Sequence, residues 1–518
     1  MLARFSFIGI LFLWCSFASA KVDRLRASLR DDPATTIVIG WDQVSGDSEM
    51  LFYDVQSHQG KLPRYSFNGG VDAQNDYGGM QNRFVRLQDL TPNTTYYFVI
   101  GDSDGVSKEY SFATLPDSAD ERISIIAGGD SRNYRDARRS ANKMVAKLHP
   151  HLIMFGGDMT GGDIPKQWIQ WMNDWQLTIT SNNRLTPIVT ARGNHEYSNK
   201  SIVALFDVPT LSNYYSIPVA DNLIRIYTLN SLIAAGGEQS EWLEQELTTY
   251  HEDVYWQLAQ YHFATRPHTG RKAERNDQLQ SWSKLFYNYG VDLVVESDAH
   301  VVKTTYPISP SRASGSQQGF IRDDKRGTVY VGEGCWGAPL RPNDDDKSWT
   351  RSSGSFNQFK WIFIDKQSIE VRTILTDTSN KVGDECLFDR FCIPSNIGIW
   401  EPPTGDVLII ESEDKDRIIG ESGANTRMAV VMDFNTSTSS NEREIQWITK
   451  NENGAVNFEL QKAASKTSRY RTIATINGQG NSQEKNYYRF IDKNESDNSA
   501  YRLKKITPEG VTLFYLGK

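Results

Sequence analysis

Five short apolar segments of this chain each end in residue types that bind metal ions, and this pattern constrains the fold more than any other feature. The residues at their ends are Asp130, Asp158, Asn194 with His195 and Glu196, His262, and Asp298 with His300. Buried parallel strands read as such continuous apolar runs, and ligands of open α/β sheets bind beyond the carboxyl ends of the strands. We therefore expect one sheet edge that collects carboxylates, an amide and imidazoles, a set that suits two metal ions.

The first twenty residues have the pattern of a secretory signal. A lone Arg4 precedes an apolar stretch from Phe5 to Phe17, and the small residues Ala18-Ser19-Ala20 follow. This order predicts cleavage after Ala20. The apolar stretch is shorter than the ~20 residues that a membrane span needs, and no later stretch is long and apolar enough. We expect an exported protein without a transmembrane segment, which is secreted, periplasmic or at the cell surface.

Composition excludes some classes of partner and predicts several domains. The net charge is −8 and no basic stripe is visible, which argues against a nucleic-acid-binding footprint. A chain of 518 residues is too long for one hydrophobic core. Three cysteines follow the signal: an exported setting permits a local disulfide between Cys386 and Cys392, and Cys335 is expected to be a buried thiol.

Changes in pattern divide the mature chain into three regions. Residues 21–118 show short alternating strands separated by Gly, Asp and Pro turns, as in an all-β sandwich. The segment Leu87–Phe98 and the closing Ser111–Pro116 resemble a fibronectin type III domain. In residues 119–411, strands alternate with helical patterns, which predicts an α/β domain.

The end of the chain returns to β patterning. A polar linker is expected at residues 412–425, followed by a C-terminal all-β sandwich over residues 426–518. Part of it, with Tyr487-Tyr488-Arg489-Phe490, resembles the β-sandwich modules that precede sorting tails in exported proteins of Bacteroidetes-type bacteria. No clear sorting tail follows, so cell-surface association stays open.

The residue types at the strand ends suggest how two cations would be held. The carboxylate of Asp158, between the first and third motifs, can bridge them by giving one oxygen to each. Asp130 and His300 would complete the first site, and Asn194, His262 and Asp298 the second. Two cations roughly 3.5 to 4 Å apart hold a bridging hydroxide and polarise a phosphoryl oxygen, so phosphate esters are the substrates that profit most.

The order of these motifs resembles the calcineurin-type metallophosphoesterases, and the β domain in front brings the chain closest to their purple acid phosphatase-like group. The motifs that carry the resemblance are Asp130, Gly157-Asp158, Gly193-Asn194-His195-Glu196, His262 and Asp298-Ala299-His300. The likeness covers about residues 22–373. It implies an αββα sandwich with a dimetal site at the strand ends, and an acid phosphatase-like enzyme that hydrolyses phosphate monoesters.

Three positions depart from the family pattern. Gly161 stands where purple acid phosphatases have a tyrosine ligand, and Arg132 stands where many other members have a histidine ligand. Asp298 replaces the first histidine of a Gly-His-x-His motif. An aspartate shifts the site toward oxygen donors and a harder metal, so Mn, Fe or Zn are the candidates. The alternative is that the second metal is weakened or lost.

The resemblance also implies roles for residues beside the ligands. His195 would contact the phosphoryl oxygen or protonate the leaving group, with Glu196 orienting it. Arg132 would point its guanidinium at the phosphate; the alternative is a salt bridge with Asp130 or Asp163. His268 lies on a loop placed like the family's substrate-contact loop.

Two other functions remain open at this point. A phosphodiesterase would use the same dimetal chemistry, because only the pocket decides between monoesters and diesters. A non-catalytic exported binding or adhesion protein would carry a degenerate metal site. Trp168, Trp171 and Trp175 could line a pocket, although their helical spacing favours core packing.

Overall fold

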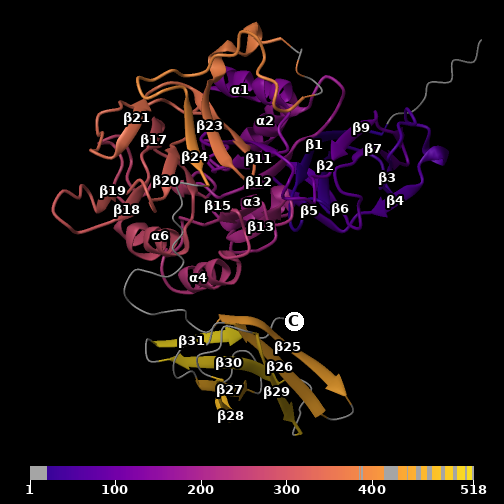
Figure 1. Ribbon diagram of the computed structural model, residues 1–518. Helices are drawn as coiled ribbons and strands as arrows, with labels where there is room; N and C mark the ends of the chain where they lie inside the picture. The colour runs from indigo at the N-terminus through magenta and orange to yellow at the C-terminus, as the bar shows by residue number, and fades with distance from the viewer. Residues whose placement is uncertain are drawn as a thin grey trace, which may run out of the picture. The chain divides into compact units, whose positions relative to one another are not determined.

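The computed structural model describes residues 20–383, 386, 389–412, 430–439, 442–450, 457–463, 470–479, 485–493, 499–507 and 510–515. The expected signal sequence before Ala20 and nearly all of the expected linker therefore lie outside the described residues. The chain divides into two compact units, of which the first is Met1–Leu243 with Asp253–Asp416 and the second is Glu244–Glu252 with Arg417–Lys518. Figure 1 shows the elements of each unit.

The first unit begins with a β-sandwich. One of its sheets holds β1 (Val22–Ser28), β2 (Ile37–Gln43), β6 (Met80–Leu87) and β5 (Ala73–Tyr77). The other holds β4 (Phe67–Gly70), β3 (Met50–Asp54), β7 (Thr95–Asp102), β8 (Gly105–Val106) and β9 (Tyr110–Ala113). Alternate side chains such as Trp41, Phe98 and Phe112 are fully buried between the sheets, which explains the alternating sequence pattern.

The sheet of β1 does not end at the sandwich, because β1 pairs in parallel with β12 (Pro187–Thr190). A ten-stranded sheet results, in the order β24-β23-β22-β10-β11-β12-β1-β2-β6-β5. The central strands β10 (Ile123–Gly128), β11 (Leu152–Phe155) and β12 run parallel to one another. The strands β22 (Gln358–Ile364), β23 (Ser368–Leu375) and β24 (Val407–Glu411) extend the sheet in antiparallel fashion.

A second, seven-stranded sheet follows the order β13-β14-β15-β16-β20-β17-β21. Its parallel centre consists of β14 (Ile224–Thr228), β15 (Trp256–Phe263), β16 (Leu293–Ser297) and β20 (Val329–Gly332). The flanks are β13 (Tyr215–Val219), β17 (Val302–Thr305) and β21 (Thr350–Gly354), and β18 (Ile308–Pro310) pairs separately with β19 (Phe320–Arg322). Every residue of β10, β11 and β16 is buried, as expected for strands covered on both faces.

Helices and short turns connect the strands along the chain. They are α1 (Arg135–Leu148), α2 (Pro165–Trp175), α3 (Asn199–Phe206), α4 (Glu238–Tyr250), α5 (Asn276–Gln278) and α6 (Lys284–Tyr289), with short turns η1 (Leu62–Arg64), η2 (Gln176–Thr178), η3 (Leu279–Ser283) and η4 (Thr376–Lys381). The rings of Trp171 and Trp175 in α2 stack on each other, with centroids 4.8 Å apart, and meet Phe155 of β11 edge-on. These tryptophans are buried core residues, so the structure favours core packing over a pocket wall.

The C-terminal unit has its own β-rich core. One sheet is β25 (Val430–Ser439), β26 (Glu442–Lys450) and β29 (Asn486–Asp492), and the other is β28 (Arg471–Asn477), β27 (Asn457–Ala463), β30 (Ala500–Thr507) and β31 (Gly510–Tyr515). Trp447, Phe458, Tyr488 and Leu503 pack together between them. The predicted fold class, with β, α/β and β regions in this order, is confirmed.

The cysteine predictions also hold. Cys386 and Cys392 form a disulfide, and Cys335 is a buried free thiol. Among the described residues, no helix is both long and apolar enough to cross a bilayer. The boundaries at residues 118 and 411 fall after β9 and at the end of β24, and we keep them as proposals.

Candidate metal centre

The predicted ligands lie just beyond the carboxyl ends of strands in both sheets. Asp130 and Asp158 follow β10 and β11, and Asp298 and His300 follow β16. All four have a left-handed backbone, with φ between 55° and 68°. Non-glycine residues rarely adopt this conformation, and such backbones cluster at functional sites.

Close approach of two loops explains the glycines beside the ligands. A Cβ atom on Gly157 would lie 2.3 Å from the backbone nitrogen of Gly193, and one on Gly193 would lie 2.2 Å from that of Asp158. Neither position can hold a side chain unless the backbone moves. The two glycines thus let the loops after β11 and β12 touch, which brings Asp158 beside Asn194.

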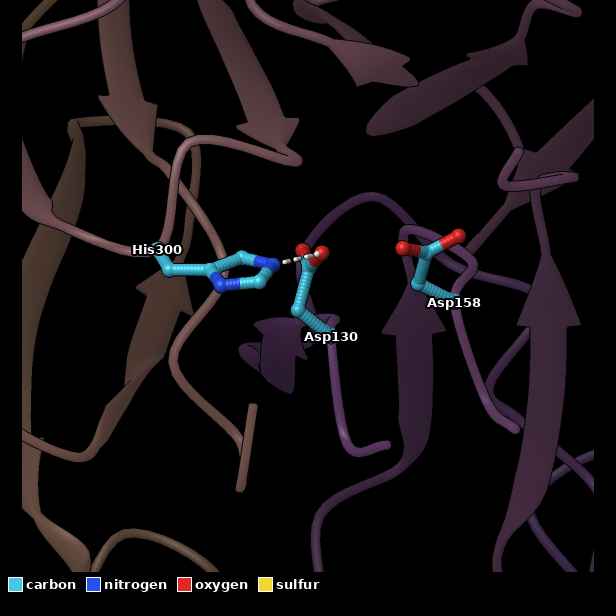
Figure 2. A group of neighbouring side chains, drawn as sticks. All are labelled: Asp130, Asp158 and His300. Carbon is cyan, nitrogen blue, oxygen red and sulfur yellow. Dashed lines mark ion pairs between the residues drawn. The ribbon is translucent and has the colours of Figure 1, made fainter. Parts of the chain in front are cut away.

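The first ligand cluster consists of Asp130, Asp158 and His300, drawn in Figure 2. One ligand atom from each lies within 4.8 Å of the others, and all three side chains are buried. His300 Nε2 lies 3.0 Å from Asp130 Oδ1. Burial would raise the pKa of Asp130, but the imidazoles of His300 and His262 outweigh it and hold the pKa at about 2. The carboxylate is therefore ionised and ready to bind a cation.

The second cluster consists of Asp158, His262 and Asp298, again with ligand atoms within 4.8 Å of one another. His262 Nε2 lies 3.3 Å from Asp158 Oδ1 and 3.6 Å from Asp298 Oδ1. The amide oxygen of Asn194 lies 3.1 Å from the same Nε2. The structure thus groups the predicted ligands in two sets that share Asp158.

Backbone carbonyls orient the two imidazoles. His262 Nδ1 donates to Gly156 O at 2.9 Å, and His300 Nδ1 donates to Pro339 O at 2.7 Å. This arrangement leaves each Nε2 directed at the carboxylates, in the manner of metal-binding histidines. Asp130 Oδ1 and Asp158 Oδ2 are buried and accept no hydrogen bond of good geometry, although the cationic partners His300 and Arg132 lie beside them. Because buried polar atoms are costly without a partner, this donor set fits two cations.

Sequence families point to the same chemistry. Residues 22–114 match the family described as purple acid phosphatase, N-terminal domain, and residues 129–302 match the calcineurin-like phosphoesterases. The chain thus combines a purple acid phosphatase-like N-terminal domain with a calcineurin-like phosphoesterase domain. The recognition made from the sequence motifs is confirmed.

Individual relatives of this chain are distant. An uncharacterized protein of Mycobacterium tuberculosis is 23% identical over 354 residues, which cover 58% of this chain and 66% of that protein. Acid phosphatase type 7 of Homo sapiens is 22% identical over 290 residues, covering 50% of this chain and 64% of that protein. The chain thus spans about two thirds of the length of these relatives.

Solved structures share the fold. The purple acid phosphatase from yellow lupin (Lupinus luteus) seeds aligns with a TM-score of 0.60 at 14% identity, covering 78% of each chain. A structure of PhoD aligns with a TM-score of 0.54 at 12% identity, covering 70% of this chain and 88% of the other.

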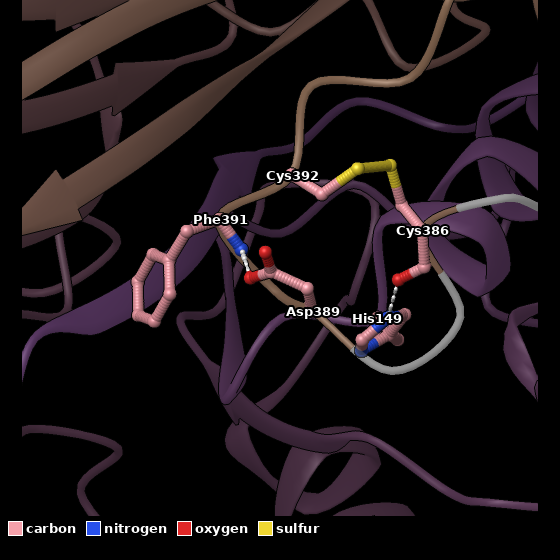
Figure 3. The surroundings of a disulfide bond; sticks show 5 residues. All are labelled: His149, Cys386, Asp389, Phe391 and Cys392. Carbon is pink, nitrogen blue, oxygen red and sulfur yellow. Dashed lines mark hydrogen bonds between the residues drawn. A yellow bond between two sulfur atoms is a disulfide. The ribbon is translucent and has the colours of Figure 1, made fainter.

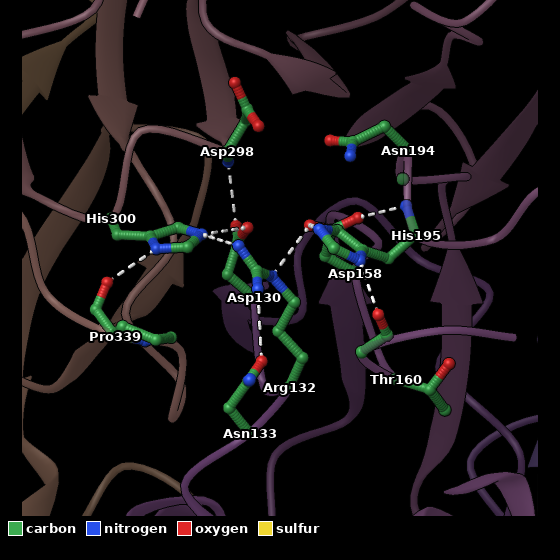
Figure 4. A network of polar contacts seen from close by, with 12 residues as sticks. Asp130, Arg132, Asn133, Asp158, Thr160, Asn194, His195, Asp298, His300 and Pro339 are labelled. Atoms are coloured by element: carbon green, nitrogen blue, oxygen red, sulfur yellow. Dashed lines mark hydrogen bonds and ion pairs between the residues drawn. The ribbon is translucent and has the colours of Figure 1, made fainter. Parts of the chain in front are cut away.

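Arg132 lies beside the first cluster, with its guanidinium between His300 and Asp158, as Figure 4 shows. Its Nε is 3.2 Å from Asp158 Oδ2, and its Nη2 is 3.5 Å from His300 Nε2. The salt bridge expected as an alternative, with Asp130 or Asp163, is replaced by one with Asp158. The guanidinium is thus at the site, and a phosphate bound to the metals would lie within its reach.

Glu196 contacts other groups than the sequence suggested. Its carboxylate accepts hydrogen bonds from the backbone N–H groups of Asp158, Met159 and Gly193, at 2.8 to 2.9 Å. Burial, and then the charge of Asp158, raise its pKa to about 7. Glu196 therefore links two ligand loops to each other, and its role in orienting His195 stays a prediction.

His195 is oriented by backbone groups. Its Nδ1 donates to Gly161 O at 2.8 Å, and its backbone N–H donates to Asp158 Oδ1 at 2.8 Å. Its Nε2 lies 3.7 Å from Asp158 Oδ2, and a quarter of the side chain is exposed. The ring is accessible at the edge of the clusters, as a group that meets substrate must be.

His268 is fully buried rather than presented on an open loop. Its Nε2 lies 2.7 Å from the hydroxyl of Thr350, and its backbone N–H donates to Glu333. Glu333 in turn pairs with the buried Lys303, which also pairs with Glu296. His268 therefore belongs to a buried polar network, and its contact with substrate stays a prediction.

Lys272 was not singled out from the sequence. Its Nζ lies 2.5 Å from Asp298 Oδ1, one of the ligand atoms of the second cluster. Arg341 also reaches this residue and donates to Asp298 O at 2.6 Å. A lysine on a loop carries no periodic or motif signal, so only the folded chain reveals this contact.

Proposed function

We propose that this protein is an exported dimetal phosphoesterase that hydrolyses phosphate monoesters, in the manner of an acid phosphatase. The observation that carries the proposal is the pair of buried ligand clusters that share Asp158. When bound, two cations would supply Lewis acidity toward a phosphoryl oxygen. Mn, Fe and Zn remain the candidate metals, because the set combines carboxylate, amide and imidazole ligands.

The chain's own residues would position the substrate. Arg132 has a planar guanidinium that can bind two phosphoryl oxygens at once. His195, with Nδ1 bound to Gly161 O, would hold a proton at Nε2 for the leaving group. Arg132 and Lys272 together place two positive groups around the clusters, which favours a dianionic monoester over a monoanionic diester.

Export rests on the signal pattern before Lys21 and on the disulfide between Cys386 and Cys392, a bond that persists in oxidising compartments. Mass spectrometry of the amino terminus of protein purified from its native host tests this part. We expect the mature chain to start at Lys21.

Metal content and ester preference test the catalytic proposal. Elemental mass spectrometry of protein purified without chelator should find near two equivalents of Mn, Fe or Zn, with a loss in Asp158→Asn. Aryl phosphate monoesters should be cleaved faster than the matching diesters, and His195→Ala should lower kcat by ~10²-fold or more. Faster diester cleavage would favour a phosphodiesterase, and no metal after supplementation would favour the binding or adhesion protein.

A further inference from the structure

A second group of basic side chains lies far from the metal centre, at the opposite ends of the same strands. It consists of His149, His151, Arg184 and Arg390, which we call the basic cluster. His149 ends α1, and His151 precedes β11, whose other end leads to Asp158. His151 Nδ1 accepts a hydrogen bond from the backbone N–H of Ser124, at the start of β10. Strands of four to six residues put roughly 15–20 Å between the two sites.

Three chain segments meet at the basic cluster. Arg184 Nη2 donates to His149 O at 3.2 Å. Figure 3 shows the hydrogen bond that His149 Nε2 donates to Cys386 O, at 2.6 Å. The disulfide of Cys386 closes the short loop that carries Arg390. Next to Arg390, the ring of Phe391 lies 6.1 Å from that of His151.

The positive groups lack a counter-charge in the part of the chain that the structure describes. Neither Arg184 nor Arg390 forms an ion pair with a described carboxylate, and the nearby Asp389 is turned to the Phe391 N–H instead. Arg122, which stacks on the same Phe391 ring, differs because it pairs with Glu370 at 2.5 Å. Unpaired buried charges are rare, because leaving water costs them several kcal/mol.

Individual atoms of the cluster also lack partners. Arg390 Nε and His149 Nδ1 are buried without any hydrogen-bond partner, and His149 is only 1% exposed. His151 is 7% exposed, and since its Nδ1 accepts from Ser124, its Nε2 carries the proton and can donate. The cluster thus offers donors from Arg184, Arg390 and His151, whereas His149 Nδ1 is an unpartnered acceptor because the His149 proton is on Nε2.

Electrostatics support the same view. Burial, and then the charge of Arg390, lower the pKa of Arg184 to about 9, and burial lowers that of Arg390 to about 10. Burial and the charge of Arg184 lower the pKa of His149 to about 4. Arg184 and Arg390 therefore repel each other in this structure, and an anion between them would remove the repulsion.

A cavity of about 250 Å³ lies against α1, although none of the four cluster residues lines it. Its lining includes Lys143 and Lys147 of α1, Ser181 on the loop before Arg184, and Ser379 and Asn380 before the disulfide loop. None of its lining residues is acidic. The cavity therefore adds two lysines near the carboxyl end of α1, but it is not itself the site formed by the cluster.

We propose that the basic cluster binds a tetrahedral oxyanion, which Arg184 and Arg390 hold through their guanidinium groups and His151 through Nε2–H. Guanidinium forks match the oxygens of phosphate and sulfate. We choose phosphate over sulfate because hydrolysis of a phosphate monoester releases phosphate, so this choice rests on the proposed function. The site itself does not depend on catalysis.

Thermal unfolding of the full-length mature protein tests the site with inorganic phosphate, sulfate and chloride at equal ionic strength. Phosphate should raise Tm by ~3 °C over chloride in the Asp158→Asn chain, where the metal centre is disabled. Arg184→Gln and Arg390→Gln in that background should abolish the rise. Arg322→Gln, which changes an exposed guanidinium paired with Asp324, is the matched control and should keep it.

A second variant keeps the test decisive if the first ones unfold. Arg390→Met removes an unpaired charge, so without phosphate its Tm should equal or exceed that of the parent. A clear drop in Tm there, or an equal phosphate rise in every variant, would overturn the proposal. The proposal would also be overturned if phosphate gave no rise in Tm and the double variant Asp384→Asn/Glu385→Gln had a lower Tm. A carboxylate of the chain would then be the partner of the arginines. A rise with sulfate alone would overturn the choice of phosphate.

Discussion

Asp158 is the one side chain on which both ligand clusters depend. Its two oxygens face different partners, with Oδ1 toward His262 and Oδ2 toward Arg132. The backbone N–H of His195 holds Oδ1 in place at 2.8 Å. At the scale of single residues, the site therefore combines one shared carboxylate with two cationic side chains. Arg132 pairs with Asp158 itself, and Lys272 pairs with Asp298 of the second cluster.

Lys272 is predicted to weaken the second metal site. Its ammonium lies 2.5 Å from Asp298 Oδ1 and competes with a cation for this oxygen. Lys272→Met should therefore tighten binding of the second equivalent, by roughly tenfold if about 1.4 kcal/mol of repulsion is removed. Metal titration by calorimetry checks this, with Lys284→Met in α6 as a control. Weaker binding in Lys272→Met would mean that the lysine supports the site instead.

Glu196 is predicted to stabilise the fold, independently of any role in catalysis. Glu196→Ala removes the acceptor of three buried backbone N–H groups, each of which costs about 1–3 kcal/mol when unsatisfied. We expect a loss of several kcal/mol in the free energy of unfolding of metal-free protein, measured by urea denaturation. Glu196→Gln keeps one acceptor oxygen and should lose less. Equal stability of Glu196→Ala and the parent would contradict this role.

At the scale of elements, strand ends were predictable and side-chain partners were not. Apolar runs identify β10, β11, β15 and β16, and parallel pairing places their carboxyl ends together, so the ligands could be expected from the sequence. The salt bridge of Arg132 with Asp158, and the burial of His268, depend on how loops from different strands pack. Contacts between distant segments produce no periodic pattern in the sequence.

The carboxyl end of α1 gives a prediction about pH. The pKa of His149 is lowered to about 4 by burial and by Arg184, while the unfolded chain titrates near 6.5. The folded state therefore binds fewer protons between these values. Stability should be full above pH 6.5 and fall as the pH drops toward 4, by up to roughly 3 kcal/mol from this group. Urea denaturation across this range should show a flatter profile for His149→Gln, and an unchanged profile would contradict the burial of a neutral imidazole.

At the scale of the whole first unit, the β-sandwich and the α/β region share one sheet. β1 pairs with β12, and side chains reinforce the junction: Arg26 Nε donates to Leu205 O, and Ser28 Oγ donates to Phe206 O, both at 2.6 Å. Arg86 pairs with Asp207 at 2.7 Å. The sequence suggested two separate domains here, because periodicity within each strand says nothing about which strand lies beside it.

Removal of the front sandwich should therefore damage the rest of the unit. A chain that starts at residue 119 leaves β12 as a bare edge strand, and such edges promote aggregation. We expect lower Tm and poor solubility, measured by thermal scans and size-exclusion chromatography. A chain that ends at residue 411 is the matched control, since the C-terminal unit has its own core around Trp447. Equal behaviour of both truncations would contradict a structural role for the shared sheet.

Because of the shared sheet, the region matched by sequence similarity and the unit that folds have different bounds. The stretch that similarity marks as the phosphoesterase, residues 129–302, starts after β10 and ends before β20 and β22. Excised as a gene fragment, it would retain β11 and β12 but lose the strands that flank them on both sides. The region that sequence similarity recognises is therefore shorter than the unit that can fold by itself. The missing strands come from both ends of the first unit.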